Sequence, residues 1–267
     1  MITNWQADLQ NLLQEEVDNA LWSDQELTRL PGLAKALNPH IVLARHTFDT
    51  IRLVIARAHA QPGDPIPCVA NRVCSQLLVQ VAQDITAVSA LIREGLAYQA
   101  VSIAASTYEH GVMLASIGND NSRAQQWLDH PNQKVNIDNV KDRTALAVKK
   151  LDEKYPGLGD KLGDLYAGMY GPLCAFKHGN PMVQRHLGTQ TVNGATHYSV
   201  YPVLDRKAVI AGCWAVETVI RVGWMGLVSF IHDHLADRSG LDDVMPGMNR
   251  GLTQLVEWRS QIEARQS

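Results

Sequence analysis

Apolar residues recur at helical spacing along most of the chain. Near the N-terminus, Trp5, Leu9 and Leu13 define one face of an amphipathic segment, which predicts a helix over about residues 4–22. The same pattern, together with cap residues, predicts further helices over about residues 23–31, 39–59, 68–93, 97–117, 121–129, 140–154, 158–170, 206–236 and 249–265. The chain is therefore predicted to be almost wholly helical.

Glycine and proline residues mark the expected breaks between these helices. The segment QPGDPIP, residues 61–67, contains three prolines and forces a loop. Gly95 and Gly118 suit the left-handed residue that ends many helices. Pro131 is expected to end one helix, and the step at residues 171–172, Gly-Pro, is expected to kink or restart another.

Strands are predicted in one place only. The segments TQTV and ATHYSVYP flank Asn193-Gly194, a dipeptide that tolerates the positive φ angles of a two-residue type I′ turn. The predicted fold class is all-α: a single-domain helical bundle of about eight or nine helices with a small β-hairpin insertion near Asn193-Gly194. Within this domain we expect N-terminal helices over residues 1–60, a core bundle over 68–182, the hairpin over 187–202 and C-terminal helices over 205–265.

Composition and charge indicate a globular protein without a strong electrostatic preference. Hydrophobic residues make up 46% of the chain and charged residues 19%, which is too apolar for a disordered protein. The net charge is -3 and no run of basic residues stands out, so binding to DNA is not expected. Four cysteines without CxxC spacing indicate reduced thiols, and the N-terminus lacks the pattern of a secretory signal. The predicted location is the cytoplasm.

Residues 207–232 are apolar except for Glu217 and Arg221, so a transmembrane helix is one alternative for this segment. Two charges in mid-span would cost roughly 3 kcal/mol each, and no second span is evident, so we expect a core helix and no membrane partner. Glu217 and Arg221 are four residues apart, and the favoured interpretation is an ion pair between them. The alternative is that both, with Cys213 and Trp224 on the same face, line a polar pocket inside the bundle.

Reactive side chains gather in the segment LCAFKHGN, residues 173–180. Cys174, Lys177 and His178 share one face of a short helix that stops at Gly179, which places a thiol, an ammonium and an imidazole side by side. A plainer interpretation is that Lys177 and His178 compensate the negative end of that helix.

Glu109 lies on a helix whose other residues are small or apolar on nearly every face. A buried carboxylate needs a partner, and Lys177, His178 and Arg221 are candidates for that role. A structural ion pair, or an edge carboxylate that reaches solvent, is the alternative.

Two sets of candidate site residues follow from these observations. The catalytic candidates are His178, Glu109 and Lys177. The ligand-binding candidates are Tyr108, Cys174, Glu217 and Arg221. No metal site is predicted, because His232 and His234 are two residues apart on a helix and point to different sides. No cofactor is predicted either, since a glycine-rich phosphate loop is absent from the sequence.

The segments GLAYQAVSIAASTYEHGVMLASI, DNSRAQQWLDHP and YGPLCAFKHGN follow one another along the chain. In this order they resemble a group of uncharacterised bacterial all-helical proteins, and they are similar to the wider HEPN and abortive-infection helical bundles, some of which are dimeric ribonucleases. The resemblance places the ribonuclease His at His178. The family motif has an Arg shortly before that His, whereas Gly171–Leu173 contain none, so the cation that stabilises developing phosphate charge is missing.

The function expected from these observations is that of a non-catalytic binding or regulatory protein. The resemblance implies a role in bacterial stress or phage defence, a homodimer, and a protein or RNA partner. One alternative is an RNA-cleaving enzyme that uses His178 as its acid or base, with Glu109 or Lys177 as partner. The other is a bundle that encloses a small ligand around Glu109, Glu217 and Arg221.

Overall fold

The computed structural model describes residues 33–59, 68–133, 139–178, 189–192, 195–198, 206–235 and 245–264. The helices predicted over residues 4–22 and 23–31 lie outside these ranges. The described elements, in chain order, are α3 (Leu33–Ala36), α4 (Asn38–His59), α5 (Val69–Arg93), α6 (Ala97–Ile117), α7 (Asn121–Gln133), α8 (Val140–Lys154), α9 (Leu158–Leu165), the π-helical segment η1 (Tyr166–Tyr170), α10 (Gly171–Lys177), β1 (Thr189–Val192), β2 (Ala195–Tyr198), α12 (Arg206–His234) and α13 (Met245–Ala264).

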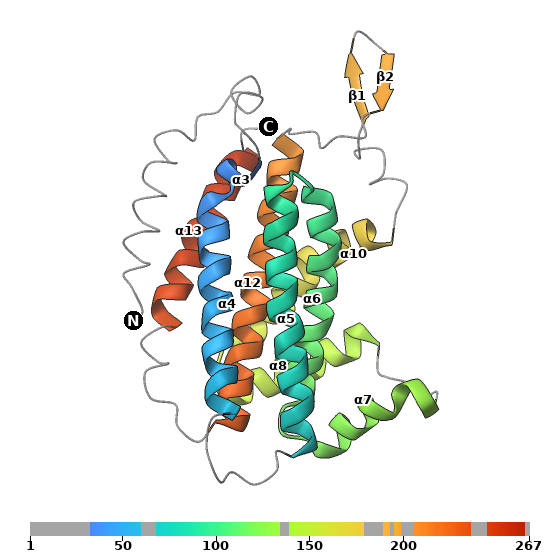
Figure 1. Cartoon of the computed structure of the whole chain (residues 1–267), viewed down its shortest axis with the longest axis vertical. Coiled ribbons are helices and arrows are strands. Elements are labelled where there is room, and N and C mark those ends of the chain that lie inside the picture. The colour runs from blue at the N-terminus through green and yellow to red at the C-terminus, as the bar shows by residue number, and fades with distance from the viewer. Residues whose placement is uncertain are drawn as a thin grey trace.

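Four long helices, α4, α5, α6 and α12, lie side by side and form the central bundle (Figure 1). The most extensive contact is between α6 and α12. Gly111 permits this approach, because a Cβ atom built on it would lie 2.1 Å from Cγ1 of Val222 on α12. The small residues of α6 thus let two helix backbones come close together.

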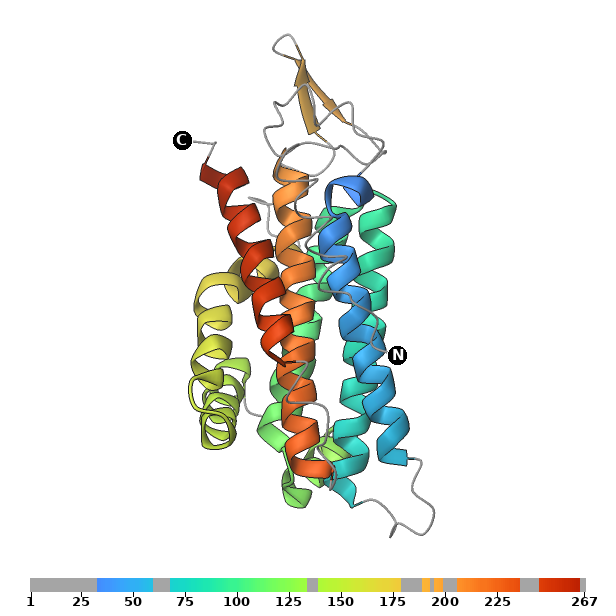
Figure 2. The same ribbon diagram turned by 90° about the vertical axis from the view of Figure 1, so that its left-hand side faces the viewer.

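The remaining helices cover the bundle on two sides. Helix α13 packs on α12 and also contacts α4, whereas α8 and α10 pack on α6. Figure 2 shows α13 crossing α12. In this view α4 lies on one side of α12, and α8 and α9 lie on the opposite side. The buried apolar side chains form two clusters: a large one inside the central bundle and a smaller one where α8 and α9 meet α6 and α12.

Local chemistry at the helix ends explains many of the boundaries. Gly95 and Gly118 have φ angles of 79° and 55° after the ends of α5 and α6, which a side chain with a Cβ atom would resist. Asn139 accepts a hydrogen bond of 3.0 Å from the backbone N–H of Asp142 and so caps α8. The helix predicted over residues 140–154 from its amphipathic pattern has these boundaries in the structure.

Of two boundaries predicted at prolines, one needs correction and one is confirmed. Helix α7 continues through Pro131 to Gln133, because a proline in the last turn removes only one hydrogen bond of the helix. At residues 171–172 the prediction of a restart is confirmed, because η1 ends at Tyr170 and the α-helix α10 begins at Gly171. Pro172 then occupies the first turn of α10, where its missing N–H costs little.

The predicted fold class needs correction in its β-hairpin insertion. No strand belongs to the helical bundle in the described part of the chain, so the fold of the protein is all-α. The short strands β1 and β2 pair antiparallel with each other, with Val192 opposite Ala195, and form no sheet with any other element. Strands of four residues bury too little surface to build a core of their own. Residues 193–194 lie outside the described residues.

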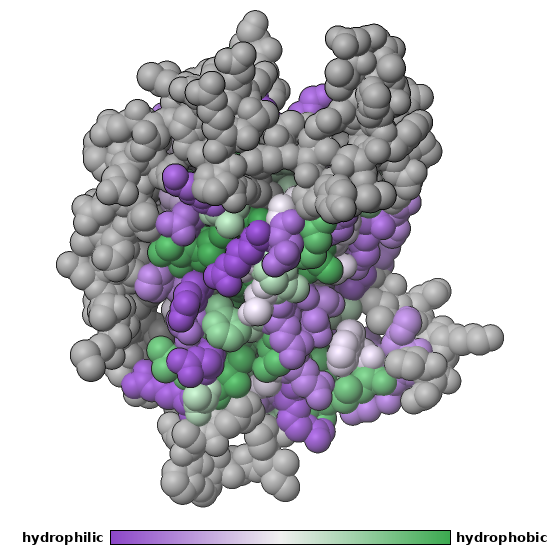
Figure 3. All heavy atoms as spheres, turned by 45° about the horizontal axis from the view of Figure 1, so that its top comes forward, coloured by the Kyte–Doolittle hydropathy of each residue, from purple (hydrophilic) through white to green (hydrophobic). Residues whose placement is uncertain are grey.

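Two described helices, α5 and α12, are long and apolar enough to cross a membrane by length and composition. Of these two helices, only α12 was weighed as a possible membrane span from the sequence. In α12, 89% of the apolar window is buried inside the protein, so packing in the core accounts for its composition. Hydrophobic and hydrophilic residues are interspersed on the face shown in Figure 3. Among described residues, the large exposed apolar side chains are Leu53, Val79 and Leu128, on three different helices.

Candidate functional site

A pocket of about 300 Å³ lies between α9, α12 and α13. Figure 2 shows these three helices side by side. Its apolar lining comes from Leu158, Trp224, Met225, Leu252 and Val256. Its polar lining comes from Lys161, Asp164, Arg221, Asn249, Thr253 and Glu257. The pocket therefore combines an apolar wall with charged and hydrogen-bonding groups, as small-molecule sites do.

Helix α12 supplies the inner wall of the pocket. Arg221, Trp224 and Met225 have the three- and four-residue spacing that puts side chains on one face of a helix. The indole of Trp224 is held in place, since its Nε1 donates a hydrogen bond of 3.0 Å to the hydroxyl of Thr47 on α4. The hydrogen bond to Thr47 therefore fixes the orientation of the Trp224 indole at the inner wall of the pocket.

Arg221 is the unusual group in this pocket. Its side chain is half-buried, and its guanidinium forms no ion pair or hydrogen bond with any residue that the structure describes. Burial lowers the pKa of Arg221, and attraction to Glu217 and Asp164 offsets this only in part. A cation that is partly withdrawn from water without a partner is a binding group for an anion.

Glu217 does not pair with Arg221, so the ion pair favoured from the sequence is wrong. Both oxygens of the fully buried Glu217 carboxylate accept hydrogen bonds from Nε of Arg259 on α13, at 2.9 and 3.1 Å. Arg259 also donates to Glu263 at 2.8 Å. The correction has a geometric cause: α13 brings its own arginine against this turn of α12, and a pairing between helices was not visible from spacing within one helix.

His40 on α4 completes this buried cluster. Its Nε2 lies 3.5 Å from Oε1 of Glu217, and its ring is 5.4 Å from that of Trp258. Burial would raise the pKa of Glu217, but His40 and Arg259 outweigh that effect and the pKa is lowered. Glu217 therefore ties α4, α12 and α13 together as a carboxylate. It does not line the pocket.

A second polar group forms where α6 meets η1 and α10. Oε1 of Glu109 accepts hydrogen bonds of 2.8 Å from Nζ of Lys177 and from the hydroxyl of Tyr170. Burial would raise the pKa of Glu109, but the bonds from Lys177 and Tyr170 lower it overall. The structure thus brings together two of the predicted catalytic candidates, Glu109 and Lys177, as a half-buried ion pair.

Two other candidates lie beside this ion pair. Cys174 lies close to the hydroxyl of Tyr170, whose pKa is raised by burial, by Cys174 and by the hydrogen bond to Glu109. The ring of Tyr108 lies 4.7 Å from that of Tyr170, and its own hydroxyl meets the hydroxyl of Thr144 at 3.1 Å. Burial raises the pKa of Tyr108 to about 12, so it stays protonated.

His178 has a different position from the one that a catalytic pair with Glu109 would require. It is exposed at the end of α10, and its backbone N–H bonds the carbonyl of Cys174. The Glu109 carboxylate is engaged by Lys177 and Tyr170 instead. The predicted cluster of thiol, ammonium and imidazole is therefore used mainly to join α10 to α6.

One polar pair between helices was not expected from the sequence. Nδ1 of His110 on α6 lies 2.9 Å from Oδ2 of Asp84 on α5, and the amide of Gln80 donates to the other oxygen of Asp84 at 3.2 Å. A carboxylate on Nδ1 fixes the orientation and tautomer of an imidazole, as in acid–base sites. The two residues are 26 positions apart in the sequence, so no local pattern indicated the pair. Neither residue lines the pocket.

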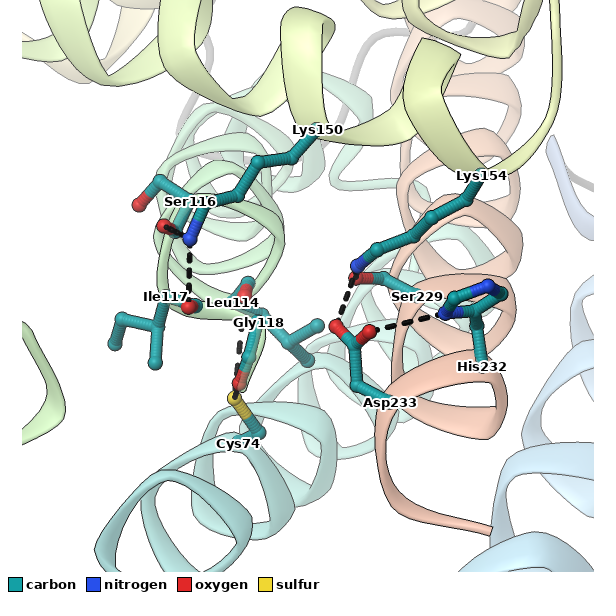
Figure 4. A network of polar contacts seen from close by, with 10 residues as sticks. All are labelled: Cys74, Leu114, Ser116, Ile117, Gly118, Lys150, Lys154, Ser229, His232 and Asp233. Carbon is teal, nitrogen blue, oxygen red and sulfur yellow. Dashed lines mark hydrogen bonds and ion pairs between the residues drawn. The ribbon is translucent and has the colours of Figure 1, made fainter. Parts of the chain in front are cut away.

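A third polar network joins the C-terminal ends of α6, α8 and α12 (Figure 4). Nζ of Lys150 donates to the carbonyls of Ser116 and Ile117 at 2.8 and 2.9 Å, and so neutralises the end of α6. Lys154 pairs with Asp233, which also meets Nδ1 of His232 at 3.1 Å. Every charge drawn in this network has a partner within it, so we assign it a structural role.

Comparison with known proteins finds no matching family model, no matching curated protein and no matching solved structure. In the part of the chain that the structure describes, no group of three or more His, Cys, Asp or Glu side chains is placed to hold a metal ion. The pocket around Arg221 is therefore considered as a candidate binding site among the described residues.

Proposed function

We propose that this protein binds a small organic molecule in the pocket between α9, α12 and α13, and that it acts by binding rather than by catalysis. The observation that supports this function most directly is the pocket itself. Its volume of about 300 Å³ lies at the lower end of the range for small-molecule sites. A peptide helix or a nucleic-acid strand would need a longer groove.

The lining supports a binding role. Five apolar side chains from three helices face the same space, and the indole of Trp224 offers a flat surface for a ring or chain. No imidazole or thiol is among the lining residues, and the ionisable groups Lys161, Asp164 and Glu257 are exposed, where water screens their charge. The lining groups are suited to hold and orient a molecule.

The position of α13 gives this binding a regulatory use. One wall of the pocket belongs to α13, and this helix is fastened to α12 by the buried pair of Arg259 and Glu217. A ligand that touches α9, α12 and α13 together stabilises their mutual packing by mass action.

The test uses N-phenyl-1-naphthylamine, a neutral dye that fluoresces when it leaves water. We expect the full-length protein to enhance its fluorescence saturably. Val256→Trp places an indole inside the pocket and should abolish this signal. Val79→Trp, at a surface position of α5 that is 39% exposed, should leave the signal unchanged.

Circular dichroism must show that both variants are folded as the wild type is. Saturable dye binding that disappears only in Val256→Trp supports the proposed function. No enhancement by the wild type, or equal enhancement by Val256→Trp, would refute it.

A further inference from the structure

We infer that the natural ligand of this pocket carries a single acidic group, a carboxylate or a similar anion, which pairs with Arg221, and an apolar part that lies against Trp224. This inference rests on the proposed function and names the chemical class of the ligand. The acidic group is inferred from the charge of Arg221, whereas the proposed function is inferred from the volume of the pocket.

The charges around the pocket divide into two kinds. Lys161, Asp164 and Glu257 are exposed at its rim, where water and salt screen them. Arg221 comes from the core helix α12 and is half-buried. The rim therefore has little selectivity for charge, and the inner wall presents one positive group.

Neighbouring carboxylates do not satisfy that group. Glu217 lies one turn earlier on α12, yet both of its oxygens are bound by Nε of Arg259. Asp164 raises the pKa of Arg221 somewhat, but the two form no ion pair. Because burial still lowers the pKa of Arg221 overall, the neighbouring carboxylates compensate its charge poorly.

An anionic ligand would remove this deficit. A guanidinium presents parallel N–H donors that match the two oxygens of a carboxylate. Such a pair is stronger in a partly enclosed pocket than on the surface, since less water competes for the charges. The apolar lining of Trp224 and Leu252 then favours a ring or an aliphatic chain next to the acid.

A competition experiment on the unmodified protein tests this class directly. N-phenyl-1-naphthylamine is bound first and is then displaced by 1-naphthoate or by 1-naphthamide, which have the same ring and nearly the same shape but differ in charge. We expect the acid to displace the dye at a concentration about tenfold lower than the amide, the difference that one charged hydrogen-bonded pair supplies.

Two variants connect that preference to Arg221. Arg221→Met keeps much of the side-chain length and removes the charge, so the acid and the amide should displace the dye equally. Arg72→Met, at an exposed position on α5, should keep the preference of the wild type. Should Arg221→Met fail to fold, the comparison of acid with amide in the wild type still decides the question.

The outcomes separate the two proposals. Dye binding without any preference for the acid, or a preference that persists in Arg221→Met, would overturn the acidic ligand and leave the pocket as a binding site. Failure of the wild type to bind the dye would overturn the proposed function itself. A preference that is lost in Arg221→Met and kept in Arg72→Met supports the inference.

Discussion

Replacing Arg259 with methionine tests how α13 is held on the bundle. Glu217 has no exposed surface, and the Arg259 side chain is 13% exposed. In the variant, the carboxylate keeps only His40, whose Nε2 is 3.5 Å from Oε1. That distance is long for a hydrogen bond, so the substitution leaves a nearly unpaired charge in the core.

The expected loss of stability follows from this geometry. Removing one partner of a buried ion pair costs about 3–5 kcal/mol, because the remaining charge has been taken out of water without compensation. His40 and the slight exposure of Arg259 place the Arg259→Met cost at the lower end, at about 3 kcal/mol. A loss of this size is a large part of the stability of an average domain.

The loss should depend on pH. Folding lowers the pKa of Glu217 from its ordinary value of 4.5, so the folded protein binds fewer protons than the unfolded chain in this range. The ion pair therefore contributes fully above that value, and its contribution is lost as the pH falls through the folded pKa. In Arg259→Met a protonated Glu217 no longer carries an uncompensated charge, so the two proteins should become more similar in stability below pH 4.5.

Urea unfolding followed by circular dichroism measures the global effect, and amide hydrogen exchange in α13 reports local release of this helix. Arg45→Met is the control, because Arg45 is 78% exposed and 3.9 Å from Asp49; such a surface pair contributes less than about 1 kcal/mol. If Arg259→Met changes both the unfolding free energy and the exchange rates no more than this control does, the role assigned to the Glu217 pair is wrong.

Two further predictions concern the core. Gly111→Ala should destabilise the fold by about 1–3 kcal/mol, because the added Cβ clashes with Val222. Gly168→Ala is the control, since an added Cβ there meets nothing within 4 Å. Urea unfolding compares the two variants, and equal stability would contradict the close approach of α6 and α12. Cys74 should resist iodoacetamide at pH 8, since burial raises its pKa to about 12, whereas the exposed Cys68 should react. Mass spectrometry of the native protein measures the modification of both cysteines, and rapid modification of Cys74 would refute its burial.

The predictions about function stand apart from those about packing. The likeness to HEPN bundles, the homodimer, the RNA or protein partner and the cytoplasmic location stay predictions from the sequence. The paired state of Glu109 argues for a structural role of the segment around His178, because a carboxylate bound to Lys177 and Tyr170 is already committed. Activity assays with RNA on wild type and His178→Ala would decide that alternative.

Most helices could be predicted because local forces set their ends. Apolar spacing, the cap at Asn139 and the glycines at positions 95 and 118 act within one or two turns. The same local reasoning found that Glu109 and Glu217 need partners. It did not find which partners, since these come from other helices.

The sequence by itself determined the helical character of the protein, the position of its core helix and the presence of unmatched charges on apolar faces. Only the tertiary structure decided that Glu217 binds Arg259, 42 residues further along the chain, and that Arg221 is left to face a pocket. The physical reason is that the partner of a charged side chain is one of the groups that tertiary packing brings within hydrogen-bonding distance. Helix periodicity acts along one segment, whereas the angles at which helices cross depend on the shape of every side chain between them.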